Sequence, residues 1–129
     1  MVKGMVIFAV LFLIIAIVFK SSQSSPPDKL EVFLKQNNAS QEIAEAYRFA
    51  LENPQRVLDK VKCYCGCLNN GAGHKNNRDC FFNDDGTFDL MGLNCGLCIK
   101  TALISKQMLA EGKSVQEISD YIDSRWQKE

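Results

Sequence analysis

Apolar residues of this chain recur at helical spacing in two regions, residues 28–60 and 95–127. Large apolar side chains three and four positions apart form one face in each segment, as expected for amphipathic helices that pack on a shared core. Short polar breaks rich in Asn, Gly and Ser separate the segments. The pattern predicts five helices, at residues 28–36, 41–51, 54–60, 95–111 and 115–127, and Asn53 is the expected cap of the third.

Several of these helix ends carry local signals. Ser40 is placed to cap the second helix, and Asn94 is a suitable N-cap for the helix that contains the last two cysteines. Gly112 is typical of the residue that follows a helix end, and Ser114 with Glu117 has the spacing of a capping box. The two C-terminal helices are therefore expected to break at Gly112. They should bury Leu103, Leu109, Ile118 and Ile122 together.

A stretch of different composition, from Cys63 to Cys98, lies between the two helical regions. It contains all six cysteines and the only histidine, His74. Its many Gly and Asn residues predict irregular structure, with Phe81 and Phe82 anchoring it to the core. The expected fold class is mainly α: an N-terminal membrane helix plus a small helical domain wrapped around a cysteine-rich irregular loop. A domain of roughly 100 residues buries a modest core, so the cysteines should contribute to its stability.

The cysteine spacing restricts how the thiols can be used. Cysteines separated by one residue rarely bond to each other, because so small a ring strains the disulfide torsion. Cys63, Cys65 and Cys67 therefore need distant partners or one shared soft metal ion. Cys95 and Cys98 are three apart, so at a helix start they share one face, where the helix dipole favours thiolate.

These patterns favour a metal site. Thiolate donors select soft ions, so the expected cofactor is copper or zinc, and Met91 could assist with copper. The candidate metal ligands are Cys63, Cys65, Cys67, Cys80, Cys95, Cys98 and His74. Two alternatives remain open: a structural scaffold of disulfides, and a thiol redox protein that uses Cys95 and Cys98.

The same residues carry a resemblance to a known family. They are Cys63-Tyr64-Cys65-Gly66-Cys67, Gly73-His74, Asn76-Asn77, Asp79-Cys80-Phe81 and Cys95-Gly96-Leu97-Cys98. This arrangement resembles the PCYCGC-motif family of small extracytoplasmic proteins, often lipoproteins, whose function is largely uncharacterised. Lys62 stands where the motif has proline, and Met91 stands where a histidine is expected in many relatives. No cysteine precedes Cys63 to carry the lipid anchor that is common in the family.

Residues 1–20 carry a membrane signal. Met5–Phe19 is an unbroken apolar run of 15 residues between Lys3 and Lys20. As a helix it is short for a hydrocarbon core of roughly 30 Å, although flanking lysines can reach the interface. No good cleavage site follows, so we expect residues 1–20 to remain as a transmembrane anchor rather than act as a removable signal segment. Residues 21–27 would then be a linker, and residues 28–129 the cysteine-rich domain.

The expected location is the outer side of the membrane, because a cysteine-dense small domain suits an extracytoplasmic setting and the resemblance implies the same. The expected partners are the membrane, through residues 1–20, and metal-transfer or metalloenzyme proteins. The 15 basic and 15 acidic side chains form no basic stripe, so no nucleic-acid partner is expected. No triad, paired-carboxylate or Gly-rich phosphate pattern is present, so a binding protein is expected rather than an enzyme.

Overall fold

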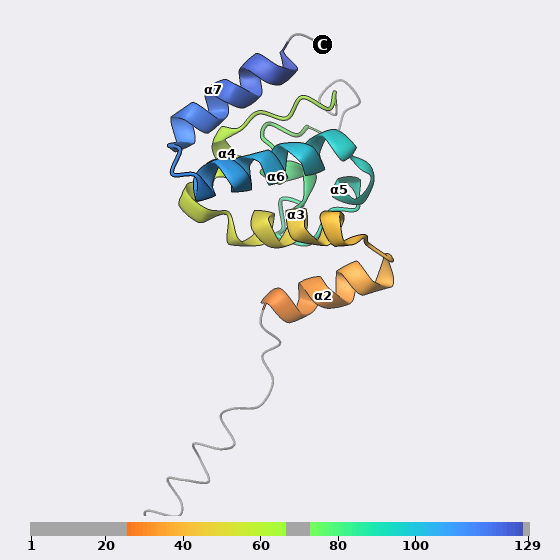
Figure 1. Cartoon of the computed structure of the whole chain (residues 1–129). Coiled ribbons are helices and arrows are strands. Elements are labelled where there is room, and N and C mark those ends of the chain that lie inside the picture. Colours follow the sequence, from red (N-terminus) through yellow and green to blue (C-terminus); the bar gives the residue numbers. More distant parts are fainter. Residues whose placement is uncertain (1–25, 67–72, 128–129) are drawn as a thin grey trace, which may run out of the picture.

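A computed structural model describes residues 26–66 and 73–127 of the chain. Every regular element in these ranges is helical, and the only strand-like pairings there are two isolated β-bridges (Figure 1). The helices are α2 (Pro26–Gln36), α3 (Gln41–Glu52), α4 (Val57–Lys60), α5 (Met91–Asn94), α6 (Gly96–Ala110) and α7 (Val115–Trp126), with 3₁₀ turns at Pro54–Arg56 and Arg78–Cys80. The mainly α fold class is confirmed.

The four longer helices follow one another in space as α2, α3, α6 and α7 (Figure 1). Helix α3 lies against both α2 and α6, and five of its residues are buried. As predicted, Ser40 caps it, with the Ser40 hydroxyl accepting a hydrogen bond from the Ile43 N–H at 3.3 Å. The buried face of α3 consists of Ala44, Ala46, Tyr47, Phe49 and Ala50.

The C-terminal helix pair forms as the sequence predicts. Gly112 adopts a left-handed conformation with φ +81°, which glycine reaches without steric cost, and α6 ends just before it. Ser114 and Glu117 form the capping box at the start of α7. Ile118 and Ile122 are fully buried against α4 and α6. Leu103 and Leu109 are only partly buried, although they pack on the same core.

One helix start was predicted wrongly, and one helix is interrupted. Asn53 ends α3 and, as predicted, precedes a new helical segment with Pro54 in its first turn, but Gln55 and Arg56 have positive φ, so residues 54–60 form a 3₁₀ turn and a short α-helix rather than one helix. Asn94 is the last residue of α5, and its side-chain amide donates back to the Leu90 carbonyl at 3.5 Å. Cys95 is therefore the N-cap residue of α6.

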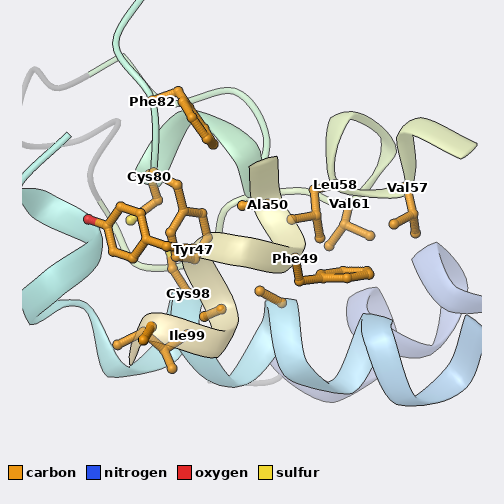
Figure 2. Packing of buried hydrophobic residues seen from close by; sticks show 14 of the residues in the cluster. Tyr47, Phe49, Ala50, Val57, Leu58, Val61, Cys80, Phe82, Cys98 and Ile99 are labelled. Carbon is orange, nitrogen blue, oxygen red and sulfur yellow. The ribbon is translucent and has the colours of Figure 1, made fainter. Parts of the chain in front are cut away.

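Two of the cysteines belong to the hydrophobic core. Both Cys80 and Cys98, the latter on α6, are buried in the core, and Cys80 lies close to the ring of Tyr47 (Figure 2). Tyr47 packs edge-on against Phe81, with ring centroids 5.0 Å apart, and Phe82 is also buried. The predicted anchoring by Phe81 and Phe82 is confirmed, and the cysteine-rich segment is packed into the helical core.

Helix α2 begins at Pro26, earlier than predicted, because proline is well suited to the first turn of a helix. The anchor predicted at residues 1–20 lies outside the described residues, as does most of the linker. Within residues 26–66 and 73–127, no helix is long and apolar enough to cross a membrane.

Candidate metal centre

Backbone hydrogen bonds position the first cysteines. The segment that we call the thiol loop comprises residues 61–66 and 73–95. Lys62 and Asn76 form an antiparallel β-bridge, and the Asn77 N–H donates to the Val61 carbonyl at 2.8 Å. This pairing fixes the chain that follows α4 against the chain that leads to Cys80. The irregular loop predicted from the sequence is therefore held at a defined place.

Asn77 connects the thiol loop to helix α6. Its side chain is 1% exposed, and its amide Nδ2 donates to the Cys98 carbonyl at 3.3 Å. Its Oδ1 has no hydrogen-bond partner although it is buried. The sequence indicated only a loop-forming role for Asn77. Its burial beside Cys98 depends on contacts between distant segments, which no local pattern signals.

Helix α7 holds the segment around Cys63 through Asp123. Tyr64, between Cys63 and Cys65, donates its hydroxyl to Asp123 at 2.7 Å. Lys62, which replaces the proline of the motif, pairs with the same carboxylate at 3.1 Å. One acidic residue of α7 therefore ties down both sides of Cys63.

Cys95 is positioned by the short helix α5. Gly92 of α5 lies so close to the core that an added Cβ would be 2.6 Å from Tyr47 Oη and 2.9 Å from the Cys80 carbonyl oxygen. Only glycine permits this approach without displacement of its neighbours. The Cys95 N–H then donates to the Met91 carbonyl at 3.0 Å and ends α5. Close packing at Gly92 thus determines how near Cys95 comes to Cys80.

The thiols converge in two groups that share Cys98. Cys63, Cys65 and Cys98 form one group, and Cys80, Cys95 and Cys98 form the other; the sulfurs within each group lie within 4.8 Å of one another. The Cys63 and Cys98 sulfurs are 3.6 Å apart, and those of Cys63 and Cys65 are 3.1 Å apart. Sulfurs that share one tetrahedral ion lie about 3.8 Å apart, given bonds of about 2.3 Å. The clustered cysteines could therefore hold a metal ion.

The described cysteines do not form a scaffold of disulfide bonds. Cys63, Cys80, Cys95 and Cys98 are free thiols, so no disulfide joins two of the five described cysteines. Cys65 is disulfide-bonded, and it could serve as a metal ligand only after reduction. Cys67 lies outside the described residues. Four free thiols are incompatible with the scaffold of three bridges that the sequence left open.

The central thiols are held in the protonated form. The hydrogen bond with Cys98, together with burial, raises the pKa of Cys63 well above its usual range. The contact with Cys63 lowers the pKa of Cys98, but the hydrogen bond with Cys80 and burial outweigh it, so the net shift is also upward. A cation bound here would replace these protons. Because a protonated thiol is a poor nucleophile, the raised pKa makes Cys98 a poor attacking group for thiol exchange.

His74 belongs to neither thiol group. Its side chain is buried, and its Nε2 lies 3.8 Å from Asp89 Oδ2. Met91 lines a surface cavity of about 390 Å³ together with Cys65 and Cys95. The structure thus brings a thioether to the cysteines and places the imidazole beside a carboxylate.

The model of one protein family matches residues 19–129, and it is described as a protein of unknown function with PCYCGC motif. The chain belongs to this family. The family relationship predicted from the sequence is confirmed, and it covers the thiol loop together with all the described helices. Comparisons with curated proteins and with solved structures found no match.

Proposed function

We propose that this PCYCGC protein binds a soft metal ion, copper in its reduced form, through Cys63, Cys80, Cys95 and Cys98. The observation that carries the proposal is the position of Cys98, whose sulfur lies within reach of free thiols from three other chain segments. Thiolates at this spacing suit an ion that accepts three or four sulfur donors.

The exposure of the cluster supports binding from solvent. Cys80 and Cys98 are buried, whereas Cys63 and Cys95 are partly exposed. An ion could therefore be received by the outer thiols and retained by the inner ones. The competing explanation is that buried cysteines serve only as small apolar core residues. That explanation does not require the partly exposed Cys63 and Cys95 to lie close to Cys98.

Met91 favours copper over zinc. Met91 is 36% exposed, and it lines the surface cavity of about 390 Å³ together with Cys95. A thioether is a good ligand for Cu(I), whereas zinc prefers thiolate, imidazole and carboxylate. On this proposal Met91 receives Cu(I) and passes it to the thiols.

The test uses the full-length chain, reduced and kept anaerobic, with Cu(I) titrated against a chromophoric chelator. We expect at least one Cu(I) per chain in the wild type and a loss of at least about tenfold in affinity for Cys98→Ser. Lys100→Ala is the matched control, because Lys100 is exposed in the same helix as Cys98 and has no sulfur, and it should keep full copper content. The proposal fails if the wild type retains no Cu(I), or if Cys98→Ser binds as tightly as the wild type.

Metal identity is tested with Met91→Leu, which keeps the apolar volume but removes the thioether. We expect slower Cu(I) uptake in this variant and unchanged Zn(II) affinity. Met108→Leu, in the last turn of α6, serves as the control methionine. Tight Zn(II) binding by the wild type without Cu(I) binding would instead identify a zinc protein.

We further propose that residues 1–20 anchor the domain to the membrane, with the domain outside the cytoplasm. The apolar run Met5–Phe19 and the cysteine-rich composition support this location. Metal-transfer or metalloenzyme proteins are the partners that this setting implies. Fractionation of cells that make the full-length chain, followed by protease treatment of intact cells, tests the proposal. A cytosolic product, or a domain protected from the protease, would contradict it.

A further inference from the structure

A second cavity, separate from the one beside Met91, is lined by residues on both sides of Cys80 in the sequence. Its volume is about 190 Å³. The side chains of Asp79, Asp84 and Asp89 line it, together with the amide of Asn83 and the imidazole of His74. None of the described residues that line it is a lysine or an arginine. The cavity therefore concentrates negative charge without a basic side chain to balance it.

His74 lines this cavity, and neither of its ring nitrogens forms a hydrogen bond with a described residue. The residue is 6% exposed, and its Nδ1 is buried without a hydrogen-bond partner. Its Nε2 lies 3.8 Å from Asp89 Oδ2, which is too far for a hydrogen bond. Two ligands of one ion, each bound at about 2.1 Å, lie roughly 3–4 Å apart. The distance between these two atoms thus suits a pair of metal ligands better than a direct contact.

Hydrogen bonds to the backbone hold the carboxylates in place. Asp89 Oδ1 accepts from the Met91 N–H at 2.8 Å, so its Oδ2 remains directed toward His74. Asp79 Oδ2 accepts from the Lys75 N–H at 2.9 Å. Side chains that are fixed before binding lose little conformational entropy when a ligand arrives. The cavity is also large enough for an ion that keeps several of its waters.

We propose that this cavity is a second metal site, separate from the thiols, which binds a divalent first-row cation through His74 Nε2 and Asp89 Oδ2. Asp79 and Asp84 supply further negative charge, and water completes the coordination. The donor set of one imidazole and several carboxylates suits borderline and hard cations, whereas the cysteines suit soft ones. The protein would then hold two ions of different chemical class. This proposal does not depend on copper binding by the thiols.

Mn(II) is the appropriate probe, because it binds nitrogen and oxygen donors and has little affinity for thiols. The full-length chain is titrated with Mn(II), and the free ion is followed by electron paramagnetic resonance. We expect one Mn(II) per chain. Electron spin-echo measurements on the bound ion should show coupling to one imidazole nitrogen. Copper loading by the thiols is measured separately, so either site can fail without the other.

His74→Gln and Asp89→Asn should each weaken Mn(II) binding at least about tenfold and remove or reduce the nitrogen coupling. Asp89→Asn keeps the acceptor for the Met91 N–H, so it preserves the fold if His74→Gln does not. Asp85→Asn is the matched control, because Asp85 lies in the same turn but does not line the cavity. It should change affinity less than about twofold. The absence of Mn(II) binding, of nitrogen coupling in the wild type, or of any effect of Asp89→Asn would overturn the proposal.

Discussion

The helical frame, α3 with α6 and α7, and the thiol loop are stabilised in different ways. The frame buries continuous apolar faces, and side-chain caps begin two of its helices. The thiol loop has only short helical turns, two isolated β-bridges and side-chain hydrogen bonds, and no disulfide joins two of its described cysteines. The frame can therefore fold through the hydrophobic effect, whereas the loop gains from a cross-link.

The two regions meet at Cys98. Helix α6 positions this cysteine as part of the frame, while its sulfur faces the cysteines of the thiol loop. Because helix α6 fixes Cys98, an ion bound to this thiol could bring the cysteines of the thiol loop together. It follows that metal binding should stabilise the loop more than the frame. Substitutions in the buried part of the frame should lower the free energy of unfolding both with and without bound metal.

The largest effect is expected from Ile118→Ala in the frame. Ile118 is fully buried where α7 packs on α4 and α6. Its truncation should lower the free energy of unfolding by about 2–5 kcal/mol, measured by urea titration. Val32→Ala, at an exposed apolar position of α2, should change it by less than about 0.5 kcal/mol. A loss below about 1 kcal/mol for Ile118→Ala would show that α7 is not part of the core.

Gly92→Ala tests the contact between the loop and the frame. The new methyl group would collide with Tyr47 Oη and the Cys80 carbonyl. We expect a loss of about 1–3 kcal/mol in unfolding free energy, together with weaker Cu(I) binding because α5 carries the chain into Cys95. Gly96→Ala has open space around its Cβ and should be neutral or slightly stabilising. Equal stability and equal Cu(I) affinity in the two variants would contradict this account.

Ser114→Ala removes the capping box of α7. The expected loss is about 1 kcal/mol in unfolding free energy, with Cu(I) stoichiometry unchanged, because the cap is far in sequence from every cysteine. Ser124→Ala in the same helix is the control, since the Ser124 hydroxyl donates to a helix carbonyl rather than capping an end. Thermal unfolding of the three proteins compares them. A smaller loss for Ser114→Ala than for Ser124→Ala would disprove the capping role.

The smallest effect on stability is expected at Asp123, whose carboxylate contacts Tyr64 and Lys62. Burial raises the pKa of this carboxyl, but hydrogen bonds from Tyr64 and Lys62 outweigh it, so the pKa is lowered overall. A lowered folded-state pKa gives stability that is present above the unfolded value, about 3.9, and is lost as the pH falls through the folded value.

Asp123→Asn should therefore be less stable than the wild type at neutral pH, by under about 1 kcal/mol, and the difference should shrink below about pH 4. Unfolding measured across pH gives the comparison. Asp120→Asn, on the exposed side of α7, should show no such dependence. A difference between Asp123→Asn and the wild type that grows as the pH falls would refute the assigned sign.

Local sequence signals determined most of the helical frame. The helix ends depend on contacts within one turn of the chain, so they can be predicted from neighbouring residues, as at Ser40, Gly112 and Ser114–Glu117. The apolar periodicity likewise identified Ile118 and Ile122 as core residues. Local signals failed at Asn94, because asparagine can begin a helix or end one, and only the packed chain selects between these.

The sequence by itself also determined the family and the concentration of thiols between Cys63 and Cys98. Only the tertiary structure decided that Cys98 lies within reach of both groups of cysteines, while His74 faces Asp89 instead. The reason is that a metal site depends on distances between side chains far apart in sequence. Those distances are fixed by long-range packing, such as the close approach of Gly92 to Tyr47, which leaves no periodic pattern in the chain.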